Sequence, residues 1–253
     1  MSIRLDGFSG RVAIVTGSSE GIGFSIAKAL AENGANILLV ARREGLLRQA
    51  AETLGPAAAW ISADLTEEGA AQKIVEKAVS TFGGIDFLVN NAGVNRLGLL
   101  GETVPSDMRQ MMELNLIAPY LMTQAALPYL AARPGAAILN VSTAGSRKPT
   151  PGEGFYCATK AGLNYLTNLW AIELADRGIR VNAIAPSGMD TPQFNKVAAT
   201  IEGAREMVAN LHLIKRIGNP EELIGAVLLL LSPVAGSFMT GAIVDVDGGY
   251  HVT

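Results

Sequence analysis

Cysteine and histidine are almost absent from this 253-residue chain, which has one cysteine, Cys157, and two histidines, His212 and His251. One cysteine excludes an internal disulfide, and so few sulfur and imidazole groups exclude a cysteine-rich or histidine-rich metal site. We therefore expect no metal. The densest apolar run, residues 223–231, is too short to cross a bilayer, and the first ten residues contain no apolar run typical of a signal peptide.

Excess charge is lacking as well, because the formal net charge is only −3 at pH 7. Such a balance offers no general attraction to nucleic acid or to an anionic membrane, so we expect neither as a partner. Apolar residues are abundant, at 49% of the chain against 17% charged, which is enough for a sizeable core. These features predict a soluble, cytoplasmic protein.

Short apolar runs alternate with longer segments of helical periodicity along the whole chain. This rhythm predicts right-handed βαβ crossovers and an α/β fold, a single-domain, Rossmann-like, doubly wound parallel sheet of seven strands with helices on both faces. We expect one domain over residues 1–253, with a substrate-binding segment at about 187–217. The expected strands are 11–16, 35–40, 57–62, 85–90, 136–142, 179–185 and 242–246. One helix is expected to follow the first strand and to end near residue 33. The other expected helices span about 44–54, 67–82, 106–130, 154–177 and 220–231.

A glycine-rich turn, TGSSEGIG, follows the first expected strand at residues 16–23. Gly17 lets the chain leave the strand sharply, Gly21 allows a close approach to a pyrophosphate, and Gly23 allows the helix to pack near the sheet. The free N–H groups of the following helix would then face the phosphates. The alternative is a glycine-rich turn without a ligand, and the strand before it and the helix after it favour the dinucleotide site.

The second expected strand ends in VARRE, where a site for NAD usually carries an acidic residue. Ala41 occupies that position and Arg42 and Arg43 follow, so the missing carboxylate favours NADP over NAD as the cofactor. An arginine fork can bind a 2′-phosphate, although both arginines also fit as solvated surface charges. Asp64, after the third strand, either accepts a hydrogen bond from the adenine amino group or serves as a helix N-terminal acid.

Tyr156 and Lys160, in YCATK, lie four residues apart and therefore share one face of a helix. A free tyrosine has a pKa of about 10, which is too high for an effective base near neutrality. A neighbouring ammonium favours the phenolate and lowers that pKa. This pair therefore predicts a general acid/base for a carbonyl/alcohol couple. Cys157 points away from the pair, and we expect it to pack in the core.

The chain resembles the short-chain dehydrogenase/reductase family over nearly its whole length. The motifs that carry the resemblance are TGSSEGIG, NNAG at 90–93, LNLIAP around Asn115, YCATK, SGMDTP at 187–192 and TGAIVDVDGG at 240–249. The resemblance implies that Lys160 also holds the nicotinamide ribose and that the Asn115 carbonyl holds a water in a proton relay. Pro119 supports the second role, because it has no N–H to occupy that carbonyl.

One position in the family pattern is ambiguous. The family places a serine thirteen residues before the tyrosine, and here that position is Thr143. The spacing to Gly145 instead points to Ser142, for which a strand-end structural role is the alternative. We favour Thr143 as the hydroxyl that hydrogen-bonds the developing oxyanion.

Residues and resemblance together predict the following two sets. The expected catalytic residues are Asn115, Ser142, Thr143, Tyr156 and Lys160. The expected cofactor-binding residues are Gly17, Ser19, Glu20, Gly21, Ile22, Gly23, Arg42, Arg43, Asp64, Leu65, Asn91, Ala92, Gly93, Tyr156, Lys160, Pro186, Ser187, Gly188, Met189 and Thr191.

Two positions depart from the family pattern. Ser187 follows Pro186 where the family often has glycine, which leaves the local turn open. Glu20 stands where NADP users often place a basic residue, and an acid there would repel a 2′-phosphate.

The most favoured function is hydride transfer between NADP(H) and a small-molecule carbonyl or secondary alcohol. The alternatives are an NAD(H)-dependent dehydrogenase of the same family, a non-catalytic nucleotide-binding regulatory protein, and an epimerase or dehydratase that uses the same Tyr/Lys chemistry. The regulatory alternative predicts loss of Tyr156 or Lys160, and both are present. The resemblance also implies a homo-oligomer, a tetramer, built on the helices near 106–130 and 154–177 and on the apolar C-terminal stretch.

Overall fold

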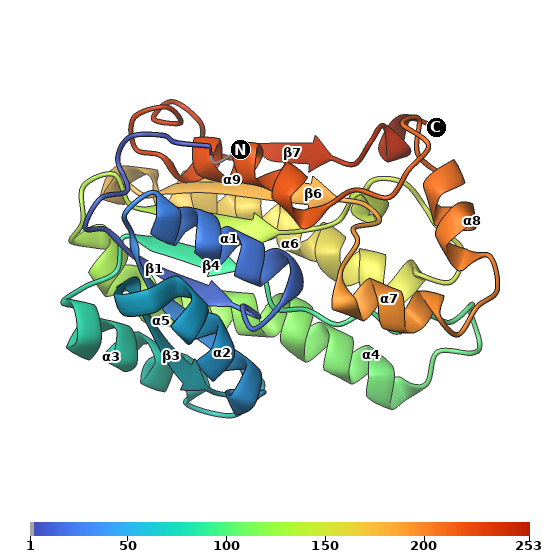
Figure 1. Ribbon diagram of the computed structural model, residues 1–253, viewed down its shortest axis with the longest axis horizontal. Coiled ribbons are helices and arrows are strands. Elements are labelled where there is room, and N and C mark those ends of the chain that lie inside the picture. Colours follow the sequence, from blue (N-terminus) through green and yellow to red (C-terminus); the bar gives the residue numbers. More distant parts are fainter. Residues whose placement is uncertain (1–2) are drawn as a thin grey trace.

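A computed structural model describes residues 3–253 and contains one seven-stranded parallel sheet (Figure 1). Its order is β3-β2-β1-β4-β5-β6-β7, so the direction of winding reverses between β1 and β4. In a sheet of this kind ligands bind outside the carboxyl ends of the strands, at that reversal. The strands are β1 (Val12–Thr16), β2 (Asn36–Ala41), β3 (Ala58–Ser62), β4 (Phe87–Asn90), β5 (Ala137–Val141), β6 (Arg180–Pro186) and β7 (Ile243–Val246).

Alternate strand residues face two separate apolar layers, because successive side chains of a strand point to opposite faces. In β1, Ala13 and Val15 pack with α1 (Gly21–Glu32), α2 (Glu44–Leu54) and α9 (Ile224–Leu231), whereas Ile14 packs with α3 (Ala70–Phe82), α5 (Ala118–Ala131) and α6 (Gly154–Glu173). Figure 1 shows α1 and α9 on the viewer's side of the sheet and α6 behind it. The predicted fold class is confirmed, including helices on both faces.

The helix expected near 106–130 is interrupted. It consists of α4 (Pro105–Met112), a π-helical turn over Glu113–Ile117, and α5. Pro119 has no N–H to donate to the carbonyl four residues earlier, which is that of Asn115. A π-helical turn, with hydrogen bonds five residues apart, therefore has a clear local cause at this point, and such turns are frequent at functional sites.

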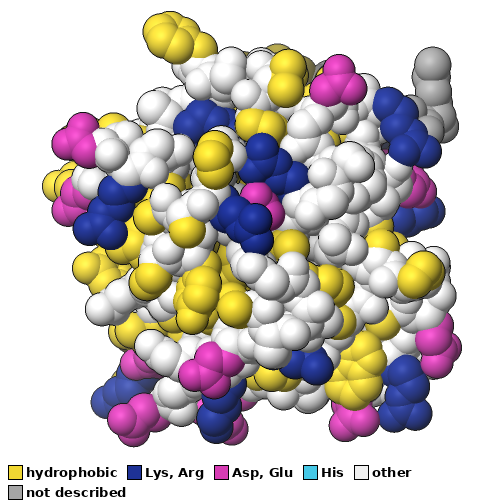
Figure 2. All heavy atoms as spheres, turned by 90° about the vertical axis from the view of Figure 1, so that its left-hand side faces the viewer, with side chains coloured by type: hydrophobic (Ala, Val, Ile, Leu, Met, Phe, Trp, Pro, Cys, Tyr) yellow, Lys and Arg dark blue, Asp and Glu magenta, His cyan; other side chains and the backbone are white. Residues whose placement is uncertain are grey.

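The less regular segment after β6 contains two short helices, α7 (Pro192–Ala198) and α8 (Ala204–Asn210). In Figure 1 they lie, with α4, at the end of the molecule toward which the strand arrows point. Figure 2 views the opposite end, where apolar side chains gather on one flank among Lys, Arg, Asp and Glu. Within residues 3–253, no helix is long and apolar enough to span a membrane.

Candidate active site

A cleft at the carboxyl ends of the strands, here called the central cleft, brings together most of the predicted site residues. The predicted residues that line it are Gly17, Ser19, Glu20, Gly21, Ile22, Gly23, Arg42, Arg43, Asp64, Leu65, Asn91, Ala92, Gly93, Ser142, Thr143, Tyr156, Lys160, Pro186, Ser187 and Thr191. Among the described residues, its lining leaves out Asn115, Gly188 and Met189. Residues that the sequence did not single out complete the wall, namely Ala63, Val94, Asn95, Leu114, Val141, Pro192 and Gln193.

The glycines of the first turn make one end of the central cleft. Gly17 and Gly21 have φ angles of +65° and +60°, a conformation that side chains with a Cβ rarely adopt. A Cβ on Gly23 would lie 2.4 Å from the Gly17 carbonyl oxygen. The Asn91 side chain fixes the turn from β4 by donating to the Thr16 and Gly17 carbonyls at 2.8 and 3.1 Å. The backbone at the start of α1 therefore faces the cleft, as phosphate binding requires.

Both arginines after β2 are paired with acids of the same cleft. Arg43 forms an ion pair with Glu20 at 2.7 Å, and Arg42 lies 3.5 Å from Asp64. Asp64 also accepts hydrogen bonds from the backbone and the hydroxyl of Thr66. The side chains of Arg42 and Arg43 remain 66% and 49% exposed, so their forks are accessible from the cleft. Glu20, which the sequence suggested as a source of repulsion, has its charge matched by Arg43.

Tyr156, Lys160 and Thr143 meet at the other end of the central cleft. Tyr156 and Lys160 lie on α6, and Thr143 follows β5 with its hydroxyl beside the Tyr156 phenol, where it donates to the Pro186 carbonyl at 3.3 Å and accepts from the Gly145 N–H at 3.4 Å. The Lys160 residue is 3% exposed, and its ammonium donates to the Val141 carbonyl at 2.8 Å. Ser142 lies beside them, but its hydroxyl donates to the Lys160 carbonyl at 3.4 Å. The helix spacing thus places the phenol and the ammonium on one wall, and the turn after β5 adds the Thr143 hydroxyl.

The expected direction of the Tyr156 pKa is wrong for this structure. Burial raises the pKa of the phenol above its ordinary value, and the neighbouring Glu153 and Cys157 act in the same direction, while the hydrogen bond with Thr143 opposes them. Burial also lowers the pKa of Lys160 to about 8. The sequence argument considered only the attraction of the ammonium for a phenolate, whereas desolvation of the phenol is the dominant effect here.

Asn115 supports this wall from behind. Its side chain exchanges two hydrogen bonds with the backbone of Val94, at 2.8 and 2.9 Å, and donates to the Thr159 hydroxyl at 3.1 Å. Gly93 lies so close that a Cβ there would approach Asn115 Oδ1 at 3.2 Å and Lys160 Nζ at 3.3 Å. The NNAG turn is therefore packed directly against the lysine.

Glu153 and Asn95 form a half-buried polar pair next to Tyr156. Asn95 donates to the Glu153 carboxylate at 3.1 Å, and the Cys157 thiol lies 3.9 Å from the other carboxylate oxygen. Burial raises the pKa of Glu153 and raises that of Cys157 to about 12. Cys157 is 8% exposed, so its predicted place in the core is confirmed. The sequence did not indicate a role for Asn95 or for Glu153, because the two residues meet only through the fold.

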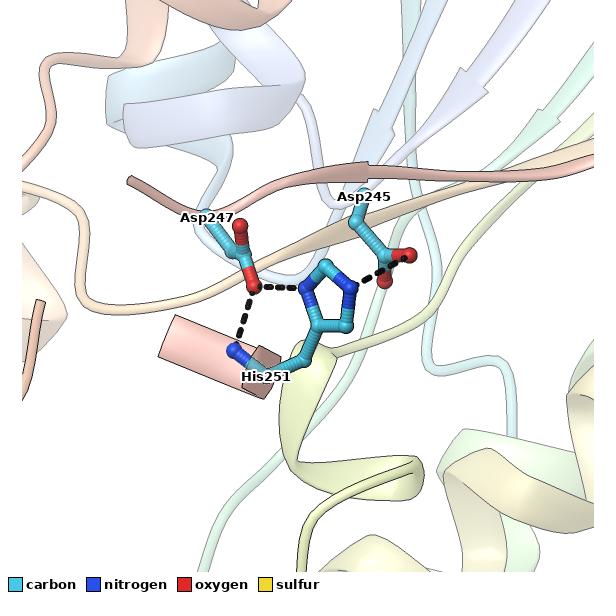
Figure 3. Close-up of side chains that lie close together, drawn as sticks. All are labelled: Asp245, Asp247 and His251. Carbon is cyan, nitrogen blue, oxygen red and sulfur yellow. Dashed lines mark hydrogen bonds and ion pairs between the residues drawn. The ribbon is translucent and has the colours of Figure 1, made fainter. Parts of the chain in front are cut away.

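The C-terminal tail is anchored beside the central cleft by Asp245, Asp247 and His251 (Figure 3). His251 Nδ1 lies 2.6 Å from Asp247, and His251 Nε2 lies 3.8 Å from Asp245. Arg147, from the turn after β5, forms an ion pair with Asp245. The arginine already matches the charge of one carboxylate, and the arrangement joins the tail to β7 and to the loop before α6.

Comparisons with known proteins agree with this geometry. Residues 17–251 match the model of the family described as enoyl-(acyl carrier protein) reductase. A 3-oxoacyl-[acyl-carrier-protein] reductase of Thermotoga maritima is 34% identical over 95% of this chain and 97% of its own length. The human dehydrogenase/reductase SDR family member 4 is 36% identical over 97% of this chain and 89% of its own length.

A solved structure gives the same result. The crystal structure of a 3-ketoacyl-(acyl-carrier-protein) reductase from Brucella melitensis, complexed with NADH, aligns with a TM-score of 0.90 and 33% identity, and the match covers 97% of this chain and 100% of that one. The fold, the glycine turn, the Tyr/Lys helix and these similarities lead to one conclusion, that this chain belongs to the short-chain dehydrogenase/reductase family of oxidoreductases.

Proposed function

We propose that the protein reduces a small-molecule carbonyl to a secondary alcohol with NADPH, and catalyses the reverse oxidation, with Tyr156 as general acid/base. The observation that carries this proposal is the meeting of Tyr156, Lys160 and Thr143 at one end of a cleft whose other end is a glycine turn. A dinucleotide fits there, because the glycine turn and the N-terminus of α1 line the cleft without side chains that would keep a pyrophosphate away from the backbone. When bound, it supplies the hydride that reaches the carbonyl carbon.

Tyr156 is protonated at neutral pH, since desolvation raises the pKa of its phenol, and it can give that proton to the carbonyl oxygen as the carbon receives the hydride. Thr143, which hydrogen-bonds the same phenol, is suited to stabilise the oxygen while its charge develops. Lys160 would stabilise the phenolate that remains and hold the ribose, and Asn115 would connect this wall to a proton relay. Ser142 and Thr143 each donate to a backbone carbonyl, of Lys160 at 3.4 Å and of Pro186 at 3.3 Å, and Thr143 is the favoured hydroxyl because it lies beside the phenol.

NADPH is the proposed cofactor because β2 ends in Ala41 and not in a carboxylate, and because two exposed arginine forks follow it. The pairing of Glu20 with Arg43 removes the repulsion that Glu20 would otherwise exert on a 2′-phosphate. NAD is the second candidate, supported by the NADH complex of the Brucella melitensis relative.

The substrate is proposed to bind between the Tyr156 end of the cleft and the segment around residues 187–217. That segment exposes Val197, Ile201, Met207, Leu213 and Ile214, each by more than 40%. Apolar side chains there suit a ketone with an apolar body. The relatives include a cis-4-hydroxycyclohexanecarboxylate dehydrogenase from Sinomonas cyclohexanicum, 37% identical over 97% of this chain and 98% of its own length, so alicyclic ketones belong in a substrate screen beside acyl thioesters.

A homotetramer is proposed as the assembly. The α5 and α6 helices expose Tyr120, Leu121, Tyr165 and Ile172, and Phe238 near the C-terminus is fully exposed. Apolar side chains on two separate faces suit two kinds of two-fold contact.

The experiment that tests the proposed function is a screen of NADPH consumption against varied ketones, followed by Tyr156→Phe on any substrate that the protein reduces. The variant keeps the ring and removes the proton, so turnover is expected to fall by about two orders of magnitude or more while NADPH binding persists. Tyr165→Phe is the matched control, because that tyrosine lies on the same helix and is 70% exposed. A Tyr156→Phe enzyme with nearly full activity would contradict the mechanism, and NADPH binding without any turnover would favour the regulatory alternative.

A further inference from the structure

The segment after β6 leaves the sheet, and its two ends are joined to each other at one point. Met189 and Gly218 form an isolated parallel bridge, Asp190 N donates to the Gly218 carbonyl at 2.7 Å, and Gly218 N donates to the Gly188 carbonyl at 3.0 Å. Residues 191–217, which include α7 and α8, are therefore an excursion that is closed at its base. We call residues 191–217 the substrate segment.

A buried histidine joins the far part of the substrate segment to the central cleft. The Ser187 hydroxyl lies 2.7 Å from His212 Nε2 and 3.0 Å from the Asp247 carbonyl oxygen. A carbonyl oxygen only accepts, so the single hydroxyl proton of Ser187 goes to Asp247. His212 must then donate its Nε2–H to Ser187. The other ring nitrogen, Nδ1, is buried and has no hydrogen-bond partner among the described residues.

The imidazole ring is packed between two glycines that approach it closely. His212 is 2% exposed, and a Cβ on Gly188 would lie 3.4 Å from its Cε1 and 2.6 Å from Val208 Cγ1. A Cβ on Gly248 would also lie 3.4 Å from the ring, and the Tyr250 ring lies 6.0 Å away. The end of α8 thus rests directly on the backbone of the turn that carries Ser187.

Ser187 itself lines the central cleft, and its hydroxyl gives its only proton to Asp247 and accepts from His212. These two bonds fix where the Ser187 residue lies in the wall of the cleft. We propose that Ser187 and His212 are positioning residues whose hydrogen bond couples the placement of the substrate segment to dinucleotide binding. The inference rests on the proposed function for the identity of the ligand. A dinucleotide that prefers the ordered turn must, by linkage, also favour the ordered segment.

Limited trypsin digestion tests the coupling, because the substrate segment carries Lys196, Arg205, Lys215 and Arg216. The probe is NADPH or NADH, whichever the wild-type protein binds more tightly in a fluorescence titration. At saturation it is expected to slow cleavage within the segment by roughly fivefold or more. His212→Leu, which removes the donor, is expected to lose this protection and to bind the dinucleotide roughly fivefold more weakly.

Two further variants separate positioning from simple damage. His212→Gln keeps an N–H donor near the position of Nε2 and is expected to restore most of the protection and affinity. Ser187→Ala is expected to weaken affinity as His212→Leu does. The double variant is expected to be no weaker than the weaker single variant, because both remove the same interaction. His251→Gln is the matched control, since His251 also bonds Asp247 but lies outside the segment, and it is expected to behave as the wild type.

Three results would overturn the inference. They are a wild-type protein that gains no protection from dinucleotide, single-variant effects that multiply in the double variant, and a loss in His251→Gln equal to that in His212→Leu. None of these readouts uses turnover. An inactive protein that binds dinucleotide therefore still tests the coupling, and a fall of activity in Tyr156→Phe alone bears only on the proposed function.

Discussion

Replacing Lys160 by methionine should make the protein more stable at neutral pH while abolishing its function. Lys160 is 3% exposed, its ammonium donates to the Val141 carbonyl, and burial lowers its pKa from 10.5 to about 8. Because one pKa unit corresponds to about 1.4 kcal/mol, burying this charge costs the folded state about 3 kcal/mol at pH 7. Methionine fills similar space and removes the charge, but it also removes a hydrogen bond that contributes about 1 kcal/mol. The expected net gain is about 2 kcal/mol.

The sign of the pH dependence follows from the direction of the Lys160 pKa. Between pH 8 and 10.5 the unfolded chain binds more protons at this lysine than the folded chain, so the wild-type free energy of unfolding rises with pH through that window. The methionine variant lacks this contribution. Its advantage of about 2 kcal/mol at pH 7 should therefore nearly vanish by about pH 9.5.

Urea unfolding at pH 7 and pH 9.5, at one fixed protein concentration, measures this difference. Lys28→Met is the control, since Lys28 is exposed on α1 and its replacement should change the free energy of unfolding equally at both pH values. A Lys160→Met protein that is less stable than the wild type at pH 7, with a gap independent of pH, would refute the reasoning. The lysine would then not be a buried charge that destabilises the fold.

Other outcomes follow from the site. Arg42→Ala should weaken NADPH by roughly 1.5–3 kcal/mol, as for a lost hydrogen bond to a charged group, and leave NADH nearly unchanged; fluorescence titration of both measures this, and equal losses would exclude a contact with the 2′-phosphate. Thr143→Ala should lower turnover by about a hundredfold or more, and Ser142→Ala much less, whereas the reverse ranking in steady-state kinetics would assign the oxyanion contact to Ser142. Carbonyl reduction, measured as kcat/KM, should fall as pH rises through about 8, because Lys160 loses its charge there; a flat profile to pH 10 would show that this charge is not needed. Light scattering at micromolar concentration should give the mass of a tetramer, and a monomeric mass would contradict the proposed assembly.

The strands and most helices were predictable because each has a strong local signal. The expected helix at 44–54 matches α2, Glu44–Leu54, and the run at 11–16 contains β1, Val12–Thr16. A buried parallel strand needs an almost continuous apolar run, and a surface helix needs an apolar stripe. The two helices of the substrate segment were not predicted. They are short, and α7 has no fully buried residue, so little periodicity marks them.

The side chains that share the central cleft were predictable as a set, but their pairings were not. The sequence identified Glu20, Arg43 and Asp64 separately. The pairing of Arg43 with Glu20, and of Arg42 with Asp64, depends on where β2 and β3 end relative to α1. His212 gave no sequence signal for its contact with Ser187, since the two are 25 positions apart and meet only because the substrate segment folds back. Asn95 and Glu153 escaped notice for the same reason.

The Tyr156 pKa shows most clearly what a motif alone leaves out. The spacing of YCATK establishes that Tyr156 and Lys160 share a helix face, and that much holds in the structure. The same burial that brings them together raises the pKa of the phenol and lowers that of the ammonium. Burial therefore favours the neutral form of both groups relative to water, so that the phenol holds its proton more tightly and the ammonium releases its proton more readily. A protonated phenol beside a hydroxyl and a lysine suits an acid that protonates a carbonyl oxygen. The four-residue spacing identifies the pair, and the depth of the site sets the protonation state that each group holds before cofactor and substrate bind.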